Sequence, residues 1–388
     1  MDYRYLIVGG GMTGHAAAAA IREKDAKGAL GMLSADPDKP YARPPLSKGL
    51  WLGKPEDKVW LPDVPGLDLH LGRRAAAIDT KKKEVRDDQG AVHRYEKLLL
   101  ATGGQPRRLP SGGERVIYYR TFRDYRRLRE VKGKSIVVIG GGFIGSEVAA
   151  ALTANGKEVT MVFPEDAMGA RVYPADLAKS ISRYFEEKGV RVLANDTVAG
   201  IEERGARTAV RTGKGHELVA DAVVAGLGIV PDTALAEAAG LRCENGIEVD
   251  EKLQASAPGV WAAGDVARFP SRPLGGRARV EHEDAALGMG RVAGHNMAGG
   301  DARVEPLPFF YSDIFEIGYE AVGRLDARLE AVASWKTPFR EGVVYYLEGD
   351  RVCGVLLLGI FGQVEAARKL IHADAPVKRE ALKDAIQA

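Results

Sequence analysis

The sequence predicts an α/β protein with two doubly wound, mainly parallel sheets and a smaller C-terminal α+β domain. An apolar strand, a glycine-rich turn and a helix occur near the N-terminus, and the same succession begins again at Ser135. The two copies begin so far apart in the sequence that each has the size of a domain, which is too long for a solenoid repeat. From Val304 onward the pattern changes to a meander of strands followed by a helix, which indicates a third domain of another kind.

Each expected element follows from a local pattern. Short apolar runs bounded by glycine indicate buried strands, and longer alanine-rich or periodic runs indicate helices. The expected strands include residues 3–8, 135–139, 158–163, 259–265, 330–334, 342–347 and 351–358. The expected helices are residues 15–24, 146–155, 279–296 and 363–372.

Composition excludes several classes of protein. The 388 residues are 45% apolar and 28% charged, which is enough for a core and is unlike a disordered chain. Lys plus Arg is 55 and Asp plus Glu is 53, so the net charge of +2 argues against a nucleic-acid or membrane-surface binder. No apolar stretch approaches the ~20 residues of a membrane helix, and no signal peptide is visible. A cytoplasmic protein is expected.

Cysteine and histidine usage narrows the chemistry. The only cysteines, Cys243 and Cys353, are far apart in the sequence. They form no disulfide framework, CxxC redox motif or iron–sulfur ligand set. The histidines show no HExxH or other ligand spacing, so no metal is expected.

The glycine-rich turns carry the first functional signal. In the pattern GxGxxG the first glycine makes a tight turn, the second lets the backbone approach a pyrophosphate, and the third lets helix and strand pack closely. The pattern occurs twice, each time between a strand and a helix, at Gly9, Gly11 and Gly14 and at Gly140, Gly142 and Gly145. Two Rossmann-type dinucleotide-binding domains are therefore expected, and glycine-rich turns that bind nothing are the alternative.

The acid that binds the ribose hydroxyls should follow the second strand of each copy. In the second copy Glu165 stands there, and no Arg or Lys follows it in the sequence until Arg171. A carboxylate repels a 2′-phosphate, so NAD is expected in preference to NADP. In the first copy Ala35 occupies the equivalent place, and Asp36 or a backbone contact must serve the ribose.

Two different dinucleotides on one chain imply hydride transfer between them, with FAD held permanently and NADH visiting. Gly264 and Asp265 close a buried strand, where the Asp could accept hydrogen bonds from the ribityl hydroxyls. The alternative is an Asp that caps a turn. The segment 41–48 has Pro44-Pro45 at the entry of a short helix, which would hold Arg43 and Lys48 at fixed points. A solvated Arg and Lys on a loop is the alternative.

These motifs resemble the ferredoxin-reductase-like branch of the two-dinucleotide-binding flavoproteins. Relatives in that branch are NADH-dependent ferredoxin and rubredoxin reductases and the apoptosis-inducing factor. RPPLSK at 43–48, ATGG at 101–104, GGGFIGSE at 140–147 and AAGD at 262–265 match the branch generally. RVEH at 279–282, FYSD at 310–313 and GYEAVG at 318–323 look closest to the apoptosis-inducing factor.

The resemblance implies roles for individual residues. Lys48, Glu147 and His282 would be catalytic. The residues implied in FAD binding are Gly9, Gly11, Gly14, Asp36, Arg43, Lys48, Ala101, Thr102, Gly103, Arg120, Gly264, Asp265, Glu281, His282 and Tyr311. The residues implied in NAD binding are Gly140, Gly142, Phe143, Ile144, Gly145, Glu147, Glu165 and Gly228. Tyr311 departs from the branch, which often has Trp there, against the flavin.

Domain boundaries follow from the repeat and from a Pro/Gly/polar linker at 105–113. We expect an FAD-binding domain in two parts, an inserted NAD-binding domain and a C-terminal α+β domain. The expected ranges are 1–110 and 234–303 for the FAD domain, 111–233 for the NAD domain and 304–388 for the C-terminal domain.

The expected function is NADH oxidation by FAD, followed by electron delivery to an acceptor. Eight arginines lie between Arg107 and Arg129, either as a solvated helix face or as a docking patch for an acidic acceptor. Three functions stay open: a reductase of a ferredoxin- or rubredoxin-type protein, a slow redox-sensing NADH-binding flavoprotein, and a reductase of a quinone or oxygen. A second copy of the chain is a further candidate partner, and no nucleic acid or membrane partner is expected.

Overall fold

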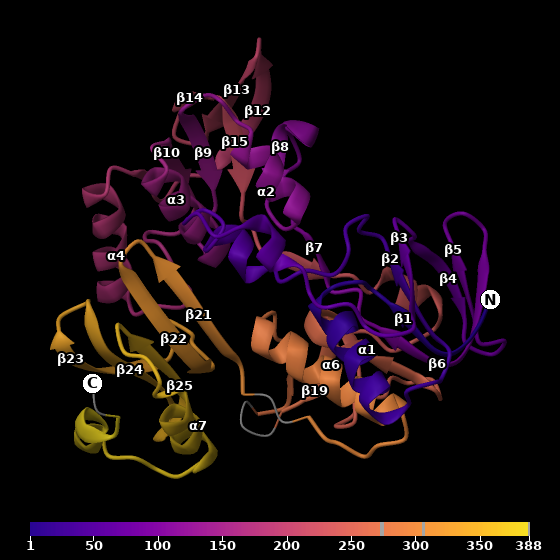
Figure 1. The fold of residues 1–388 in the computed structure, drawn as a ribbon. Coiled ribbons are helices and arrows are strands. Elements are labelled where there is room, and N and C mark those ends of the chain that lie inside the picture. Colours follow the sequence, from indigo (N-terminus) through magenta and orange to yellow (C-terminus); the bar gives the residue numbers. More distant parts are fainter. Residues whose placement is uncertain (272–274, 305–306, 387–388) are drawn as a thin grey trace. The chain divides into compact units, whose positions relative to one another are not determined.

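The computed structural model describes residues 1–271, 275–304 and 307–386. The chain divides into two compact units (Figure 1). Unit 1 consists of Met1–Ala42, Asp57–Gln105 and Val230–Pro308, and unit 2 consists of Arg43–Glu56, Pro106–Ile229 and Phe309–Ala388. The short strands β7 (Gly104–Pro106) and β16 (Ile229–Pro231) lie where the chain passes between units. The expected boundaries at 110, 233 and 303 stay a prediction, and 305–306 and 387–388 of the expected C-terminal domain lie outside the described residues.

Unit 1 is built on a mixed sheet with strand order β3-β2-β1-β6-β5-β4, in which β18 also pairs with β6. The pairs among β3, β2, β1, β6 and β18 are parallel, whereas β5 pairs antiparallel with both β4 and β6. The strands are β1 (Asp2–Val8), β2 (Leu30–Ser34), β3 (Leu67–Leu71), β4 (Ala75–Asp79), β5 (Glu84–Asp87), β6 (Val92–Leu100) and β18 (Val260–Ala262). The buried central strands are apolar on both faces, as expected for a parallel sheet covered by helices.

Two helices of unit 1, α1 (Met12–Lys24) and α6 (Glu283–Met297), pack closely against each other. Glycine makes this possible: a Cβ on Gly290 would lie 2.5 Å from the Thr13 carbonyl oxygen, and one on Gly294 would lie 2.3 Å from that of Ala17. The smaller elements of the unit are the 3₁₀ turn η4 (Gly264–Val266), α5 (Ala234–Ala238), β17 (Ile247–Glu248), β19 (Ala267–Pro270) and β20 (Arg277–Ala278). A further turn, η2 (Glu56–Val59), begins at a unit boundary.

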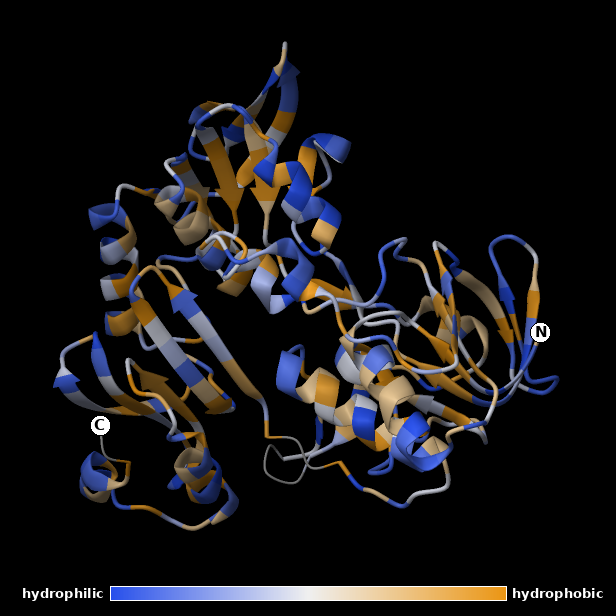
Figure 2. Ribbon diagram, in the orientation of Figure 1, coloured by the Kyte–Doolittle hydropathy of each residue, from blue (hydrophilic) through white to orange (hydrophobic). Residues whose placement is uncertain are grey.

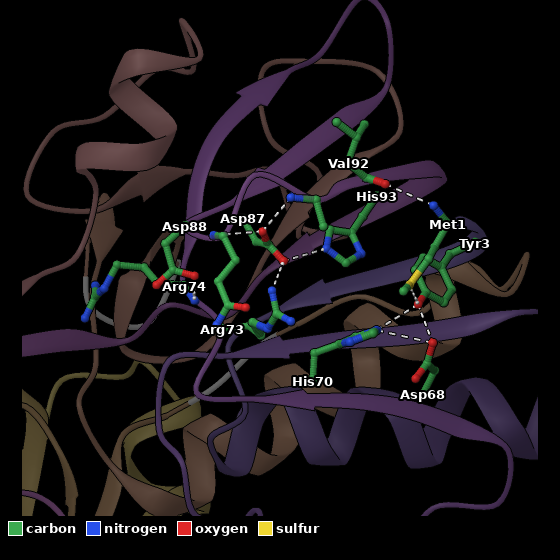
Figure 3. A network of polar contacts seen from close by, with 12 residues as sticks. Met1, Tyr3, Asp68, His70, Arg73, Arg74, Asp87, Asp88, Val92 and His93 are labelled. Carbon is green, nitrogen blue, oxygen red and sulfur yellow. Dashed lines mark hydrogen bonds and ion pairs between the residues drawn. The ribbon is translucent and has the colours of Figure 1, made fainter.

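A polar network ties the strands of the unit 1 sheet together (Figure 3). The buried Asp87 lies 3.1 Å from His93 Nε2 and accepts a hydrogen bond of 3.2 Å from Arg73. Burial alone would raise the pKa of Asp87, but hydrogen bonds from His93 and from the backbone N–H groups of Ala91 and Gln89 outweigh it, so the pKa is lowered. This carboxylate stabilises the turn between β5 and β6.

Unit 2 contains a five-stranded parallel sheet with the order β11-β10-β9-β15-β8. Its strands are β8 (Val116–Tyr118), β9 (Ser135–Ile139), β10 (Glu158–Val162), β11 (Arg191–Leu193) and β15 (Ala222–Ala225). Its helices are α2 (Phe122–Arg129), α3 (Phe143–Ala154) and α4 (Ala175–Glu187). Figure 2 shows β9 and β15 as hydrophobic and much of α2 as hydrophilic, consistent with a buried sheet and an exposed helix face. A small antiparallel sheet adds β12 (Val198–Arg204), β13 (Arg207–Thr212) and β14 (Glu217–Ala220), and the short turns are η1 (Pro44–Ser47) and η3 (Gly113–Arg115).

The C-terminal part of unit 2 is a five-stranded antiparallel sheet in the order β21-β22-β25-β24-β23. Its strands are β21 (Phe309–Ile314), β22 (Ile317–Gly323), β23 (Glu330–Thr337), β24 (Glu341–Glu348) and β25 (Arg351–Leu358). The helix α7 (Val364–His372) and the turn η5 (Arg379–Asp384) follow. The buried faces of β24 and β25 form the core of this part.

The predicted fold class is confirmed: two Rossmann-like sheets, of which one is parallel and one is mainly parallel, and a C-terminal antiparallel sheet. The expected strand 135–139 matches β9, and α1 and α3 begin three residues earlier than expected because the glycine motif itself forms their first turn. The helix expected from residue 279 starts at Glu283, since His282 is still extended. In the described ranges no helix is long and apolar enough to cross a membrane. The cytoplasmic location stays a prediction.

Candidate active site

The first glycine turn, between β1 and α1, has a backbone that only glycine allows. Gly9 has φ +122°, and a Cβ there would lie 2.1 Å from the Ala101 carbonyl oxygen. A Cβ on Gly14 would lie 2.0 Å from the Gly9 carbonyl oxygen. Gly11 is the N-cap of α1 and gives no side-chain hydrogen bond, so the first-turn N–H groups have no side-chain cap. Such a helix N-terminus suits a pyrophosphate.

The neighbouring strand ends of unit 1 carry the other expected residues. Thr102 and Gly103 follow β6, and Thr102 Oγ1 donates a hydrogen bond of 2.8 Å to the Asp232 carbonyl oxygen. Gly264 and Asp265 form η4 after β18. Gly264 has φ +76°, and a Cβ there would lie 2.2 Å from Thr13 Oγ1 in α1, so this position also requires glycine.

Asp36 follows β2 by two residues and already has partners. Its Oδ2 accepts a hydrogen bond of 2.9 Å from Tyr41 Oη, and its Oδ1 accepts one of 3.1 Å from the Asp38 N–H. A carboxylate with one oxygen bound to Tyr41 has fewer acceptor sites left for a ribose. The structure therefore leaves the choice between Asp36 and a backbone contact open.

Arg279 links two of the expected flavin residues, a role that the sequence analysis missed. Its Nη1 lies 2.6 Å from Glu281 Oε1 and donates a hydrogen bond of 3.1 Å to the Asp265 carbonyl oxygen. Its position at the start of the RVEH motif was the available signal.

Burial lowers the pKa of the nearby His282 to about 4, although the Asp265 carboxylate acts in the opposite direction. His282 is therefore neutral near pH 7.

The second glycine turn, between β9 and α3, repeats the first. Gly140 has φ +112°, and a Cβ on Gly145 would lie 2.0 Å from the Gly140 carbonyl oxygen. Gly142 caps α3 without a side-chain hydrogen bond, and a Cβ there would meet nothing within 4 Å. Ile144 is 40% exposed beside this turn, and Gly228 has φ +78° with open space around it.

Glu147, in the first turns of α3, collects three donors from other segments of unit 2. Lys48 Nζ donates to its Oε1 at 2.7 Å, and Ser312 Oγ donates to the same oxygen at 2.5 Å. Ser47 Oγ donates to Oε2 at 2.5 Å. The Glu147 side chain is 4% exposed and that of Lys48 is 13% exposed. A nearly buried ion pair is stable when the remaining lone pairs are hydrogen-bonded, which the two serines achieve.

Ser47 and Ser312 are two further residues that the sequence analysis missed. Both lie inside motifs that it singled out, RPPLSK and FYSD, but a serine in a loop or strand gives no signal of its own. Only the fold brings residues this far apart in the sequence to one carboxylate.

Aromatic side chains surround the ion pair. Lys48 Nζ lies 5.3 Å from the centroid of the Tyr311 ring, and the rings of Phe143 and Phe310 are 4.9 Å apart. The buried Tyr173 and Tyr319 cross edge to face at 5.9 Å. Burial raises the pKa of both tyrosines, so their hydroxyls stay protonated and the surroundings of Glu147 hold no second negative charge from them.

The Pro-Pro segment forms a short 3₁₀ turn, as expected. Arg43 is the N-cap of η1, and its carbonyl oxygen accepts a hydrogen bond of 3.0 Å from the Leu46 N–H. Lys48 ends this turn, so its backbone position is fixed. Arg120 stands immediately before the capping box of α2, and its backbone N–H donates a hydrogen bond of 3.1 Å to Asp124.

Glu165 follows β10 at the place expected for the ribose acid. The structure places Arg171 beside it, with Nη2 2.5 Å from Glu165 Oε1. The sequence spacing suggested that no cation would stand next to this carboxylate, and that expectation is wrong because the loop folds back. Glu165 is thus part of an ion pair.

Both thiols are free and neither is activated. Burial raises the pKa of Cys243 to about 11, and burial also raises the pKa of Cys353. Both shifts keep the thiols protonated near pH 7, and a mechanism without a thiol nucleophile stays a prediction. In the described part of the chain, no group of three or more His, Cys, Asp or Glu side chains is placed to hold a metal ion.

Comparison with known proteins assigns the family. The model "Pyridine nucleotide-disulphide oxidoreductase" matches residues 3–290, which include both glycine turns. The chain belongs to this family. The model "Apoptosis-inducing factor, mitochondrion-associated, C-term" matches residues 333–373, in the C-terminal antiparallel sheet and α7. The predicted membership in this group of enzymes is confirmed.

Two relatives with different names are equally similar to this chain in sequence. Apoptosis-inducing factor 1 of Dictyostelium discoideum is 33% identical over 99% of this chain and 80% of its own length. The ferredoxin–NAD(+) reductase component of the anthranilate 1,2-dioxygenase system of Burkholderia cepacia is 33% identical over 98% of this chain and 97% of its own. A putidaredoxin reductase, solved as a covalent complex with putidaredoxin, superposes with a TM-score of 0.92 at 31% identity, covering 98% of this chain and 96% of that one.

The family implies FAD and NAD(P)H, and the two glycine turns fit them. Each turn has uncapped helix N–H groups, and at Gly142 the space that a Cβ would fill is open. When bound, FAD accepts a hydride from the nicotinamide and releases electrons to an acceptor. Among the residues predicted for the site, Lys48, Glu147, Tyr311 and Phe143 meet in unit 2. Asp265, Glu281 and His282 belong to unit 1, and the roles of all these residues stay a prediction.

Proposed function

We propose that the protein oxidises NADH with bound FAD and passes the electrons to a small acidic iron–sulfur protein of the ferredoxin or rubredoxin type. One NADH supplies two electrons, so each turnover reduces two one-electron acceptors and releases a proton. The observation that carries the proposal is an arginine-rich surface on unit 2, next to the segment that bears Lys48.

This arginine surface consists of the exposed arginines between residues 107 and 129, most of them on or near α2. In that stretch the acidic residues are Glu114 and Asp124 alone. The exposed members are Arg107, Arg108, Arg115, Arg123, Arg126, Arg127 and Arg129. Arg126 pairs with Glu56 at 2.9 Å and Arg115 pairs with Glu203 at 2.5 Å, which reduces the positive excess without removing it. Surfaces of this kind steer an acidic partner.

Three contacts connect this surface with the Lys48 turn. The Arg129 guanidinium lies 5.0 Å from the centroid of the Trp51 ring. Trp51 Nε1 donates hydrogen bonds to the Leu46 carbonyl oxygen at 2.8 Å and to Tyr119 Oη at 3.2 Å. Leu46 lies in η1, directly before Ser47 and Lys48. A partner on α2 would thus rest beside the turn that presents Lys48.

Within this proposal the residues of unit 2 have distinct tasks. Lys48 supplies positive charge to the reduced flavin, which is more negative than the oxidised form, and Glu147 holds the ammonium in place. The carboxylate of Glu165 accepts hydrogen bonds from the ribose hydroxyls, which supports NADH over NADPH. In unit 1, Asp265 binds the ribityl chain and the neutral His282 faces the flavin.

The test is NADH-driven reduction of an acidic ferredoxin compared with reduction of a quinone. The double variant R123E/R127E should lower kcat/KM for the ferredoxin about tenfold while leaving quinone reduction unchanged. The control variant K179E/R183E changes the charge equally on α4 and should behave as wild type. Equal ferredoxin kinetics in wild type and R123E/R127E would contradict docking at this surface. Fast quinone reduction with no measurable ferredoxin reduction would favour a small-molecule acceptor.

A second candidate function is redox sensing with slow turnover. It is supported by the match of residues 333–373 to the C-terminal model of the apoptosis-inducing factor and by the Dictyostelium relative. It requires a long-lived complex of reduced flavin with NAD and a change of oligomeric state. Stopped-flow reoxidation of the NADH-reduced protein by ferredoxin, together with light scattering with and without NADH, distinguishes the two. Rapid reoxidation by ferredoxin at constant mass supports the reductase, and slow reoxidation with a change of mass supports the sensor.

A further inference from the structure

We propose that Glu316 is a positioning residue: it fixes the tip of the β21–β22 hairpin on α4 and thereby holds Ser312 against Glu147. The inference rests on the proposed role of the Lys48–Glu147 ion pair at the reduced flavin and adds a remote residue to it. Glu316 lies outside the motifs that the sequence analysis singled out.

The turn of this hairpin has an unfavourable backbone. Ile314 of β21 pairs with Ile317 of β22, so the turn consists of Phe315 and Glu316. Phe315 has φ +53°, and hairpins with a left-handed first turn residue favour glycine there. A bulky side chain in this conformation is strained, and it persists only where neighbouring contacts hold it.

The helix α4 supplies those contacts. The Glu316 carboxylate accepts one hydrogen bond from Tyr184 Oη and another, of 2.7 Å, from Lys188 Nζ. The Phe315 ring packs edge to face against the rings of Tyr184 and Phe185, at centroid distances of 5.8 Å and 5.1 Å. Tyr184 and Phe185 are buried, so the strained turn rests on a well-packed surface.

The charges at the tip are stable over the working pH range. Hydrogen bonds from Lys188 and Tyr184 lower the pKa of Glu316 to about 2, and the bond to Glu316 raises the pKa of Lys188. The Glu316 side chain is 71% exposed, and exposed ion pairs contribute little to global stability. Removing this carboxylate should therefore release the tip without unfolding unit 2.

The short strand β21 connects the tip with the ion pair. Alternate residues of a strand share a face, which places Phe310, Ser312 and Ile314 on one side of β21. On that side the Phe310 ring lies 4.9 Å from the Phe143 ring of α3, and Ser312 Oγ donates its 2.5 Å hydrogen bond to Glu147 Oε1. A shift of the hairpin along its own axis would therefore move Ser312 away from Glu147.

Loss of the Ser312 hydroxyl would change the charge beside Lys48. A hydroxyl that donates to Glu147 offsets part of its negative charge, so without this bond the pair is less positive toward the flavin. The Tyr311 ring, 5.3 Å from Lys48 Nζ, would move with the same strand. Release of the tip should therefore lower the flavin potential and slow its reduction by NADH.

A double-mutant cycle on the FAD-loaded protein tests this coupling. Glu316→Ala should slow flavin reduction by NADH about threefold, and Ser312→Ala about fivefold, with FAD content unchanged. Both variants should lower the two-electron potential, measured by titration with dithionite and redox dyes. Glu316→Ala combined with Ser312→Ala should match Ser312→Ala alone, because the tip acts through the serine. Glu316→Gln should give a smaller effect than Glu316→Ala, since it keeps an acceptor for Tyr184.

Hydrogen–deuterium exchange gives a measurement that is independent of activity. In Glu316→Ala the amides of 309–323 should exchange faster, while those of α3 stay as in wild type. The control is Glu187→Gln, which removes the same charge from α4 and breaks its 3.8 Å contact with Arg340, in the turn before β24. This control should leave the potential, the reduction rate and the exchange of 309–323 unchanged.

Three results would overturn the proposal: a wild-type potential and rate in Glu316→Ala, additive effects of the two substitutions, or unchanged exchange in 309–323. Failure of NADH to reduce the wild-type flavin would overturn the proposed function instead. The dye titrations and the exchange measurements need no NADH, so they would still decide the role of Glu316.

Discussion

The two glycine turns have nearly the same backbone and differ in the acidic residue near the end of the neighbouring strand. The N-cap glycines, Gly11 and Gly142, have φ values of −81° and −85°. After β2 the chain has Asp36, which is bound to Tyr41, whereas after β10 it has Glu165, which is bound to Arg171. Steric constraints thus dictate the turn, and the acidic residue after the strand, with its partner, is what differs between the two copies.

The largest effects are expected when each glycine turn is disrupted separately by a substitution. In Gly14→Ala and Gly145→Ala the new Cβ would lie 2.0 Å from a carbonyl oxygen, and relieving that clash costs roughly 2–4 kcal/mol locally. Gly14→Ala should be purified without FAD. Gly145→Ala should keep its flavin spectrum and lose reduction by NADH in stopped-flow measurements.

Gly288→Ala is the matched control for both variants. Gly288 lies inside α6, where a Cβ would meet nothing within 4 Å. This variant should behave as wild type, or its free energy of unfolding should be higher by about 0.5–1 kcal/mol, because alanine favours the helix. If Gly145→Ala bound NADH as tightly as wild type, the assignment of the second turn to NADH would be wrong.

The next effect concerns the ion pair, which has no counterpart at the first turn among the described residues. Lys48→Ala should lower the two-electron potential of the flavin by roughly 30 mV, which corresponds to about 1.5 kcal/mol, and should slow reduction by NADH. Glu147→Gln should change the potential less. Lys54→Ala, an exposed lysine in the same segment, is the control. If Lys48→Ala and Glu147→Gln both lost FAD, and the flavin potential of the remaining holoprotein were unchanged, the ion pair would have only a structural role.

A smaller effect is expected from Gly142→Ala, which should weaken nucleotide binding at the second turn without affecting folding. In Gly142→Ala the new methyl group meets open space and φ is −85°, so the thermal midpoint should not change. The methyl group should obstruct the pyrophosphate and raise the Kd for nicotinamide nucleotide about tenfold. A tight-binding Gly142→Ala protein would show that the pyrophosphate does not approach this residue.

The pH dependence should come from unit 1. His282 has its pKa lowered to about 4 by burial, so it stays neutral while an unfolded histidine protonates near 6.5. The unfolded state therefore binds more protons between these values, and stability should decrease as the pH falls from about 6.5 toward 4. His282→Asn should flatten this decrease. The rate of flavin reduction in wild type should stay constant from about pH 5.5 to 8, and a rate that rises on protonation would contradict a neutral His282.

The smallest effect is expected at the two cysteines, one in each unit. Cys353 is buried and Cys243 is partly buried, and the resulting desolvation raises the pKa of both thiols. The double variant C243S/C353S should reduce its flavin with NADH at the wild-type rate. Lost hydride transfer with FAD still bound would argue for a thiol-dependent mechanism.

The sequence predicts the turns well and the side-chain clusters poorly. Gly9 and Gly140 are visible because a local steric demand allows only glycine there, and the strands beside them are visible because they are apolar. The donors to Glu147 and the fold-back of Arg171 depend on where distant segments meet. Serine occurs in many structural contexts, so no local sequence pattern identifies Ser312 as a donor. Arg279 is a different case: its motif was recognised, but its contacts with Glu281 and with the Asp265 carbonyl oxygen depend on how the backbone turns there.

The donors around Glu147 also have a consequence for biosynthesis. Ser47 is 100 residues away in the sequence and Ser312 is 165 residues away. Closing loops of this length costs chain entropy before any contact compensates it, so such contacts form late in folding. On the ribosome the carboxylate has only Ser47 and Lys48 as donors until β21 has emerged. A nascent or truncated chain therefore lacks the complete cluster, and the assembled ion pair is a property of the finished polypeptide.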